Sequence, residues 1–297
     1  MTVPTAATAG SMTEAGFDAA RPPVRPAVRL VWILLGVVAA ALHVLSWGPS
    51  ALVELARSTE TVDTSFPADS VTAVEVRSEG GPVEVIGGAP DRATVSATVA
   101  HGLLTTDYRA ELEGSTLVIT ADCPWGTTQR CSAAVTVSVP SAVPVTVSTP
   151  DAVSVESIEE PVDVSGDSGP VTLTGVDAPV TVRSDSGDIQ LDDLSGPVTA
   201  TTDSGSVTGQ RIAASEWSAT SDWGNISVDF TTPPDRVEVV SADGNVRIVV
   251  PGGENRYRVA VSAGTDRAEI GVVQDPDSPH DLDLRSETGQ IRVIGAD

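Results

Sequence analysis

The sequence contains no lysine, so all 17 of its basic residues are arginines, and these stand against 41 acidic residues for a formal net charge of -24. A surface this acidic repels the phosphate groups of DNA and RNA. The composition therefore predicts that nucleic acid is not a partner of this protein. The chain of 297 residues is long enough for one large domain or two smaller ones.

Cysteine is also scarce. The only two, Cys123 and Cys131, lie in the stretch ADCPWGTTQRCSAAV, between two runs that read as strands. A cysteine pair that flanks a hairpin loop in an exported segment predicts a structural disulfide. A redox or metal-binding pair is disfavoured, because it would need C-x-x-C spacing or neighbouring histidines.

One long run has no charged residue. Residues 30–47 read LVWILLGVVAAALHVLSW and follow Arg21, Arg25 and Arg29. At about 1.5 Å per residue this run reaches roughly 27 Å, which is enough to cross a bilayer core. A cleaved signal peptide is the alternative, but the run is longer than usual for one and no A-x-A site follows closely. The sequence predicts an uncleaved single-pass anchor with the N-terminus inside and the bulk of the chain outside the cytoplasm.

Five segments are expected along the chain. Residues 1–29 are rich in alanine, threonine and proline and predict a disordered cytoplasmic tail, followed by the anchor at 30–47 and a linker at 48–66. Residues 67–150 predict a strand-rich N-terminal region that holds the disulfide hairpin and caps the first coil of the repeats. Residues 151–297 carry the repeats themselves.

An internal repeat runs through the second half of the chain. Its units begin PVDVSGDSG, PVTVRSDSG, PVTATTDSG, WSATSDWG and RVEVVSADG, and their turn glycines fall at 169, 187, 205, 224 and 244. Each unit alternates apolar and polar residues on both sides of its turn, as two short strands do. A unit of 18 to 20 residues is too small to bury its own apolar face. The repeat therefore predicts an all-β fold, a β-solenoid of stacked coils.

Trp217 tests the register of this repeat. It occupies the inward position that Val198 holds one unit earlier, where a larger side chain would overpack a narrow core. Ala200, Ala219 and Gly209 fall at neighbouring inward positions that valine or leucine usually fills. Small residues beside one large residue keep the packing density of a protein core, so the pattern predicts that Trp217 points inward.

The stretch GDSGP at Ser168 resembles the nucleophile motif of chymotrypsin-like serine proteases. The same turn recurs as SDSGD and TDSGS in the next two units, so Ser168 belongs to a repeated turn. In such turns the aspartate is expected to accept a backbone hydrogen bond and the glycine to take a positive φ. A protease would also need a histidine and an aspartate on two barrels. We expect no catalytic serine here.

Stacking the units predicts a column of aspartates at the turns, formed by Asp167, Asp185, Asp203 and Asp222. Such a column is a candidate calcium site, although the opposite turns lack the second half of the ligand set of a calcium-binding β-roll. Solvated turns are the alternative. Trp223 replaces the turn serine and is a candidate contact for a sugar or a protein.

Several stretches together resemble the bacterial "putative adhesin" family of β-strand-repeat domains, whose function is largely undefined. They are GPVEVIGG, LVITADCP with VTVSVP, and the serial SGDIQL and DGNVRIVVP units, which cover residues 68–294. The resemblance implies a cell-envelope protein and supplies no catalytic residues. The anchor expected at 30–47 places that protein in the bacterial cytoplasmic membrane.

The function expected from these features is a non-enzymatic binding, adhesion or structural role in the cell envelope. Cell-wall glycans and envelope proteins are the expected partners. Three alternatives stay open: an envelope sensor that signals through residues 1–29, a calcium-binding β-roll, and a carbohydrate-active enzyme with an arginine beside an acid, such as Arg211 beside Asp193.

Overall fold

The computed structural model describes residues 34–38, 58–89, 91–101, 106–123, 132–264 and 268–296. The chain divides into two compact units, Met1–Leu55 and Ala56–Asp297. In the first unit, residues 34–38 are helical and exposed, and most of the predicted anchor lies outside the described residues. No helix in the described part of the chain is long and apolar enough to cross a membrane.

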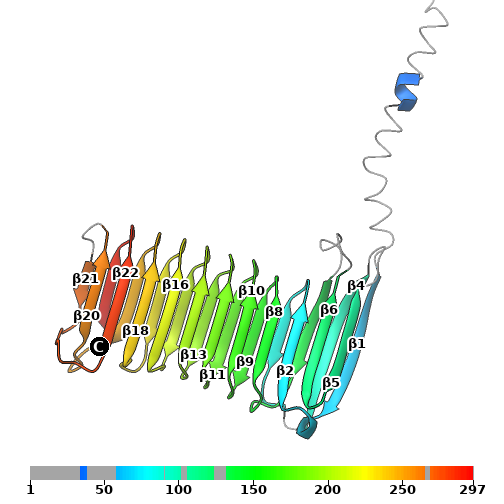
Figure 1. Cartoon of the computed structure of the whole chain (residues 1–297), viewed down its shortest axis with the longest axis horizontal. Coiled ribbons are helices and arrows are strands. Elements are labelled where there is room, and N and C mark those ends of the chain that lie inside the picture. The colour runs from blue at the N-terminus through cyan, green and yellow to red at the C-terminus, as the bar shows by residue number, and fades with distance from the viewer. Residues whose placement is uncertain are drawn as a thin grey trace, which may run out of the picture. The chain divides into compact units, whose positions relative to one another are not determined.

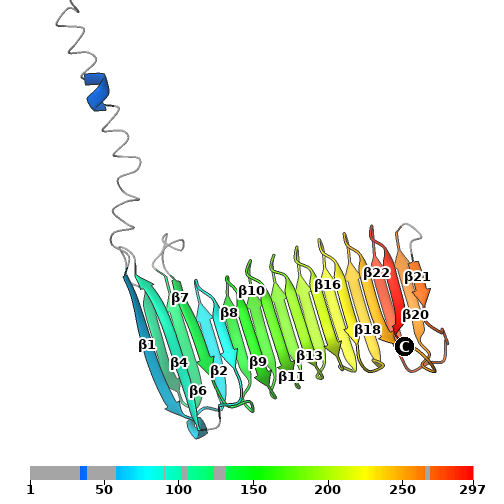
Figure 2. The same ribbon diagram turned by 180° about the vertical axis from the view of Figure 1, so that it is seen from behind.

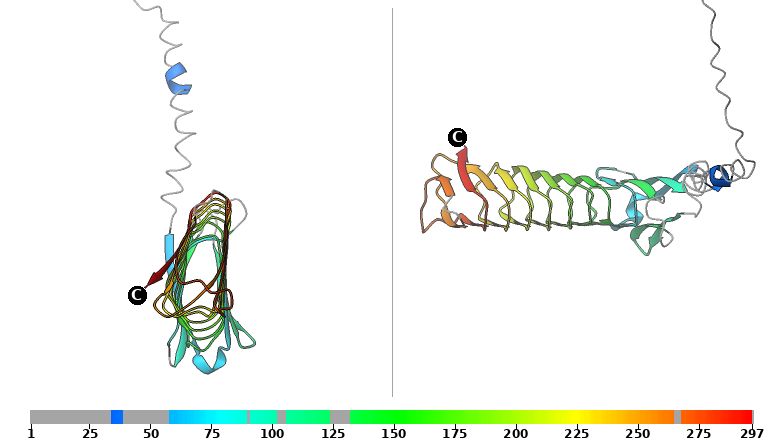
Figure 3. Two further views of the ribbon diagram at one scale, coloured as in Figure 1. Left: turned by 90° about the vertical axis from the view of Figure 1, so that its left-hand side faces the viewer. Right: turned by 90° about the horizontal axis from the view of Figure 1, so that it is seen from above.

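The second unit is a β-solenoid whose coils each contain two strands, as the repeat predicts (Figure 1). One strand of each coil lies in an 11-stranded sheet, here called sheet B, and the next lies in a 12-stranded sheet, here called sheet A. Seen along the stack, the coils superimpose as flattened loops (Figure 3). The two sheets face one another, and the aliphatic side chains between them form one continuous core.

The central coils follow one another in chain order and pair in parallel (Figure 2). Their strands alternate between sheet B and sheet A, in the order β8 (Val145–Thr149), β9 (Val153–Ile158), β10 (Val162–Gly166), β11 (Val171–Val176), β12 (Val180–Ser184), β13 (Ile189–Leu194), β14 (Val198–Thr202), β15 (Val207–Ile212), β16 (Glu216–Ser221), β17 (Ile226–Phe230), β18 (Arg236–Ser241) and β19 (Val246–Pro251).

The N-terminal end of the stack contains antiparallel as well as parallel pairs. It consists of β1 (Ser58–Pro67), the 3-10 helix η1 (Ala68–Ser70), β2 (Ala73–Ser78), β3 (Val83–Ile86), β4 (Arg92–His101), β5 (Asp107–Glu113), β6 (Thr116–Asp122) and β7 (Ser132–Ser138). β1 begins inside the segment expected to be a linker. Neither sheet breaks at residue 151, so these strands extend the same stack.

At both ends the coils are stacked out of chain order. The β2–β3 coil lies between the β6–β7 and β8–β9 coils. At the other end, β20 (Arg258–Ala263) and β21 (Ala268–Gly271) form the outermost coil. The last two strands, β22 (Asp281–Ser286) and β23 (Ile291–Ala296), insert between that coil and β18–β19. Because the coils resemble one another, each could pair with several others, so the sequence repeat did not predict this order.

The register predicted from Trp217 is confirmed. Trp217 pairs with Val198 in the neighbouring strand and is 2% exposed. A Cβ atom on Gly209 would lie only 2.8 Å from Cη2 of the Trp217 ring, so the glycine makes room for the indole. Phe230 completes the packing with an edge-on ring contact at 6.0 Å between centroids. The indole N–H has no hydrogen-bond partner within the described chain.

A second column shapes the coils on sheet A. Four residues spaced by 18 adopt left-handed φ angles of 58°, 64°, 57° and 51°, and they are Ser157, Gly175, Asp193 and Arg211. Each makes the chain present two outward residues in succession and then turn an aliphatic residue inward. A side chain in this region costs about 1–2 kcal/mol, and only the second of the four positions has a glycine to avoid it.

Candidate functional site

The repeated turns are held by buried hydroxyl groups. In one coil, Gly187 N–H donates to Ser184 Oγ at 2.9 Å, and Ser184 Oγ lies 3.2 Å from the carbonyl oxygen of Asp167 in the preceding coil. The next coil repeats the arrangement, since Gly205 N–H donates to Thr202 Oγ1 at 3.0 Å. Equivalent hydroxyls donate to the preceding coil from Ser221, Ser241 and Ser286. This column of hydroxyls joins each turn to its neighbour.

The turn glycines are required for a different reason from the one expected. None of those at 169, 187, 205, 224 and 244 has a positive φ. A Cβ atom on Gly187, Gly205, Gly224 or Gly244 would lie 1.9–2.1 Å from a carbonyl oxygen of the preceding coil. Close stacking, not backbone conformation, therefore excludes a side chain. The expectation that the turn aspartates would accept the hydrogen bond is also corrected, because the hydroxyl one residue earlier accepts it.

The four candidate aspartates, Asp167, Asp185, Asp203 and Asp222, do stack as a column with exposed side chains. The backbone carbonyl oxygen of each aspartate accepts a hydrogen bond from the next coil at 2.7–3.0 Å. The donor is the backbone N–H of the turn residue that occupies the position after the aspartate. Among the described residues no group of three or more acidic, histidine or cysteine side chains is arranged to hold a metal ion.

Ser168 lies in the same column of turns. Its hydroxyl is 3.4 Å from the carbonyl oxygen of Pro150, which also accepts the N–H of Ser168 and of Gly169. Three contacts on one carbonyl dock this turn on the coil before it. Ser168 therefore has a place in the stacking of the turns.

Trp223 occupies the position of Ser168, Ser186 and Ser204 in the earlier turns. Its backbone N–H donates to the backbone carbonyl oxygen of Asp203 at 2.8 Å, and its side chain is 66% exposed. The ring is thus presented to solvent from a fixed turn, and it stays a candidate ligand contact.

Cys123 follows β6, and its N–H donates to the Glu79 carboxylate at 2.8 Å. It is not a free thiol. Cys131 lies outside the described residues, so the pairing of the two cysteines stays a prediction.

The outward face of sheet A carries a groove that the sequence reasoning missed. One hollow of about 360 Å³ lies over β11, β13 and β15 and is lined by Thr172, Thr174, Gln190, Leu191, Asp192, Thr208 and Gln210. A second hollow of about 320 Å³ lies over β3, β7, β9 and β11, with alanine, proline and valine in its lining. Thr172 lines both hollows, so they adjoin.

The charge around this groove is arranged in rows. Five outward positions that are neighbours across sheet A carry no charge, and they are Ser154, Thr172, Gln190, Thr208 and Ser227. Residues 151–235 contain 16 acidic residues and two arginines, a net charge of -14. An uncharged row in so acidic a segment could have been found from the repeat by aligning the outward positions.

Asp192 is the acid of the first hollow. One of its carboxylate oxygens pairs with Arg211, and the other, Oδ1, is buried without a hydrogen-bond partner. The sequence suggested Asp193 as the neighbour of Arg211, but the arginine pairs with Asp192. The groove thus holds a buried acceptor beside neutral donors from threonine and glutamine.

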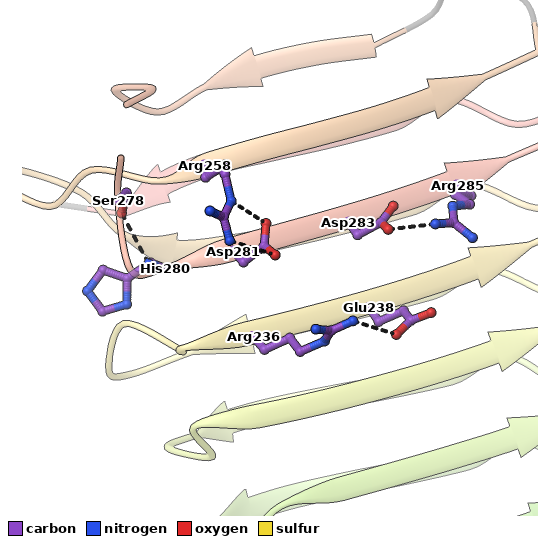
Figure 4. Close-up of polar contacts among 8 residues, drawn as sticks. All are labelled: Arg236, Glu238, Arg258, Ser278, His280, Asp281, Asp283 and Arg285. Atoms are coloured by element: carbon purple, nitrogen blue, oxygen red, sulfur yellow. Dashed lines mark hydrogen bonds and ion pairs between the residues drawn. The ribbon is translucent and has the colours of Figure 1, made fainter. Parts of the chain in front are cut away.

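The outward face of sheet B has a different character at its C-terminal end, where the charges are matched in pairs (Figure 4). Arg236 pairs with Glu238 at 3.4 Å, and Arg285 with Asp283 at 2.6 Å. Arg258 pairs with Asp281 across two strands, which raises the pKa of Arg258 and lowers that of Asp281. These are exposed pairs, which contribute little to stability and leave no arginine of the cluster available to an anion.

The chain is similar to several solved structures. A "putative adhesin" from Bacteroides fragilis is 14% identical and superposes with a TM-score of 0.49, covering 80% of this chain and 98% of that one. A "putative lipid binding protein" from Parabacteroides distasonis is 16% identical with a TM-score of 0.40 and corresponding coverages of 80% and 97%. For a "putative adhesin" from Parabacteroides merdae the values are 13%, 0.28, 79% and 96%.

No curated protein matches the chain. The family model described as Toastrack DUF4097 matches residues 67–276, which is most of the solenoid and more than half of the chain. The chain belongs to the Toastrack DUF4097 family.

Proposed function

We propose that this protein is a non-enzymatic binding protein of the bacterial cell envelope, and that the groove on sheet A binds an extended, uncharged carbohydrate polymer. The observation that carries the proposal is the pair of adjoining hollows, with short polar side chains in one and apolar side chains in the other. Sugars present both hydroxyl groups and apolar C–H faces, so such a groove matches their chemistry.

The proposed ligand is uncharged because the row of outward side chains that it would cross on sheet A carries no charge. Ser154, Thr172, Gln190, Thr208 and Ser227 carry no charge, and the acidic turns that flank them would repel an anionic polymer. Hydroxyl and amide groups both donate and accept hydrogen bonds, as sugar hydroxyls do. Asp192 Oδ1 is an acceptor that a sugar hydroxyl would satisfy.

The ligand is a polymer because of the length of the row. Adjacent strands lie about 4.8 Å apart, so five neighbouring positions span roughly 19 Å. That span accommodates several sugar units in line. A small metabolite would leave most of the groove empty.

The groove does not suit glycoside hydrolysis. Glycosidases place two carboxylates about 5–10 Å apart. The two carboxylates that line the groove, Glu84 and Asp192, lie on β3 and β13, three strand spacings and therefore roughly 14 Å apart. Binding without turnover is the consistent proposal.

The location is part of the same proposal. The uncharged run at 30–47 and the arginines before it support a single membrane anchor with the solenoid outside the cell. The sensor alternative concerns residues 1–29, which lie outside the described residues.

The test uses the full chain in detergent micelles and isothermal titration with length series of uncharged oligosaccharides from glucan, chitin, mannan and xylan. We expect at least one series to bind, more tightly as the oligomer lengthens. The double substitution Gln190→Ala and Gln210→Ala removes two hydrogen-bonding groups and should weaken binding about tenfold.

The matched control is Thr199→Ala with Ser218→Ala, at outward positions of sheet B, which should bind like the parent. Absence of binding in all four series, or an equal loss in the control, would refute the assignment. New reducing ends after incubation would instead indicate an enzyme.

A further inference from the structure

The N-terminal end of the stack contains one strand without a counterpart. Sheet A has 12 strands and sheet B has 11. At the C-terminal end the two sheets finish in the same coil, with β21 and β20. At the N-terminal end sheet B finishes at β5, whereas sheet A continues past β4 to β1 (Figure 1). No described strand lies beside β5 and opposite β1, and we call this position the N-terminal slot.

The side chains around the N-terminal slot are largely apolar and only partly covered. In β6 the inward Leu117, Ile119 and Ala121 are no more than 1% exposed. Their partners in β5 are half-buried, and they are Leu112, Ala110 and Tyr108. The inward side chains of β1 are half-buried as well, and they are Val62, Thr64 and Phe66. The core is therefore open at this end by the width of one strand.

The free edge of β5 presents the backbone of its inward residues. The carbonyl oxygen of Ala121 accepts a hydrogen bond from the N–H of Glu79, so the inward residues of β6 bond to the segment of β2. The outward residues of β6 then bond to β5, where they engage the outward residues. The N–H and C=O groups of Tyr108, Ala110 and Leu112 consequently point into the N-terminal slot.

The free edge of β1 has the opposite arrangement. The N–H of Ala68 donates to the carbonyl oxygen of Asp91, which continues the antiparallel register of β1 and β4. Every second residue of β1, counted back from Ala68, therefore bonds to β4, and these are the inward residues. The N–H and C=O groups of the outward Thr61, Asp63 and Ser65 point to the free edge.

These two edges match as a parallel pair. In a parallel pair, a residue whose N–H and C=O reach the neighbouring strand bonds to the two residues that flank its aligned partner. Ala110 of β5 can thus align with Thr64 of β1, since Asp63 and Ser65 offer the free groups and both aligned side chains point inward. An antiparallel pair would instead align residues with free groups, which would set inward side chains of β5 against outward ones of β1.

We propose that two copies of this chain dimerise at their N-terminal ends, with β1 of each copy in the N-terminal slot of the other. A two-fold axis parallel to the strands produces this arrangement, because it brings sheet A of one copy into line with sheet B of the other. Phe66 of one copy then lies beside Leu112 of the other. The C-terminal end of a second copy does not fit, because β21 accompanies β20 and would overlap β1.

The strand directions agree with this axis. Within one molecule β1 runs with the parallel strands of sheet A, whereas β5 runs against those of sheet B. The parallel strands of the two sheets are themselves opposed, because each coil goes out along one sheet and returns along the other. β1 and β5 therefore run in the same direction. Rotation about an axis along the strands keeps that direction, so β1 of one copy meets β5 of the other as a parallel pair.

Charge selects one register of this pair. The alignment of Thr64 with Ala110 places Asp63 beside Arg109 of the other copy. Arg109 bonds to Asp107 through one nitrogen at 2.6 Å, and its guanidinium has further N–H donors. A shift by two residues would instead place Asp63 beside Glu111, and two carboxylates side by side repel.

Unpaired charges of opposite sign also meet at the interface. Glu111 and Glu113 have no ion pair within the described residues. Arg92, at the start of β4, has no acidic partner there either, and its guanidinium bonds to Ser65 Oγ at 2.5 Å, which holds it over β1. The proposed register puts Ser65 of one copy beside Glu111 of the other. Arg92 thereby comes within reach of both glutamates, and electrostatic complementarity of this kind fixes register.

The same axis brings both chains into the dimer from one side. β1 begins at Ser58, and an axis along the strands leaves the two Ser58 residues at the same edge of the dimer. Two chains that are each anchored in one membrane before this residue, as proposed above, need such an arrangement.

Disulfide cross-linking between two variants of the full chain in detergent micelles tests the pairing. Thr61→Cys in one chain and Asp107→Cys in the other are aligned outward positions with Cα atoms about 4.8 Å apart, within the reach of a disulfide. Mild oxidation of the mixture should give the mixed dimer. Each variant oxidised alone should give none, because like positions lie on opposite sheets. Thr199→Cys, in the middle of sheet B, is the matched control and should give none with Thr61→Cys.

Three results would overturn the proposal. The first is the absence of any mixed cross-link above the Thr199→Cys control and above the parent chain oxidised in the same way. The second is a Thr61→Cys chain that cross-links to itself as readily as to Asp107→Cys, which would mean that two β1 strands lie side by side. The third is a parent chain that stays monomeric at every concentration, which would leave the N-terminal slot to a different partner.

Ala110→Pro separates association from folding. It removes an N–H that points into the N-terminal slot and none that bonds to β6. We expect the concentration-dependent rise in sedimentation coefficient of the parent to be lost, with an unchanged circular dichroism spectrum. Association that persists in Ala110→Pro would contradict the pairing of β5 with β1.

A charge exchange tests the register without touching the backbone. Arg92→Glu should weaken dimerisation about tenfold, because the two-fold symmetry places this charge at two positions of the interface. Combining it with Glu111→Arg and Glu113→Arg in the same chain should restore the affinity of the parent. A combined variant that dimerises no better than Arg92→Glu alone would refute the register.

Discussion

Replacing Gly209 by alanine is the sharpest test of the core. The new methyl group would lie 2.8 Å from the Trp217 ring and 2.8 Å from a methyl group of Val228. Overpacking of this kind costs about 1–3 kcal/mol. Alanine also restricts the unfolded chain, and this raises the free energy of unfolding by about 0.4–1 kcal/mol at a position such as this one, where φ is not positive. We expect a net loss of about 1–2 kcal/mol.

The same substitution should cost less when the indole is removed, because one of the two closest contacts then disappears. Trp217→Val alone loses buried apolar area, worth about 2–4 kcal/mol, and regains about 1 kcal/mol because the buried indole N–H has no partner in the described chain. With valine at 217 the alanine methyl at 209 fills part of the space. The double mutant should then be more stable than the sum of the single effects by about 2 kcal/mol.

Urea unfolding followed by far-ultraviolet circular dichroism measures all four proteins of this cycle, since the signal does not depend on tryptophan. The free energies of unfolding give the coupling directly. If Gly209→Ala is equally destabilising with and without Trp217, the packing argument is wrong. As a comparison in the same assay, Trp223→Ala should change stability by less than about 0.5 kcal/mol, because that ring is exposed.

Three further predictions concern the coils and the core. Gly205→Ala should lower stability by at least about 2 kcal/mol, because its methyl group would lie 2.1 Å from a carbonyl oxygen of the preceding coil. In the control Gly114→Ala the methyl group meets no atom within 4 Å, and the change should cost about 1 kcal/mol. Equal losses of stability in thermal melts would contradict the stacking argument. Ser157→Gly should raise stability by about 0.5–1 kcal/mol, since it relieves a left-handed φ of 58°, and a loss would refute this. Burial raises the pKa of Tyr108 and Tyr257 to about 12, so stability should fall as pH rises from 10 toward 12, and phenolate absorbance in the folded chain near pH 10 would contradict it.

The repeat made the coil predictable because each unit states the same pattern. Val180, Val198 and Trp217 occupy one inward row, as their spacing predicted. The small residues around Trp217 were equally informative, because a core has a fixed volume and one large side chain demands smaller neighbours.

The sequence predicted where the turns lie but not which hydrogen bonds hold them. A serine or threonine precedes the turn in every unit after the first, as at Ser184 and Thr202, and that signal was visible. Its meaning depended on the neighbouring coil, since each hydroxyl bonds its own turn and the preceding one. Hydrogen bonds between units separated by 18 residues cannot be read from one unit.

Alternation within a strand and recurrence between units are local properties, so the amino-acid sequence alone predicts stacked two-strand coils and the side chains that face inward. The order of the coils at the ends and the groove on sheet A are visible only in the folded chain. Each of these depends on which of several like coils become neighbours. Parallel pairing is almost equally favourable between any two of them, so the choice is made by the folded stack as a whole.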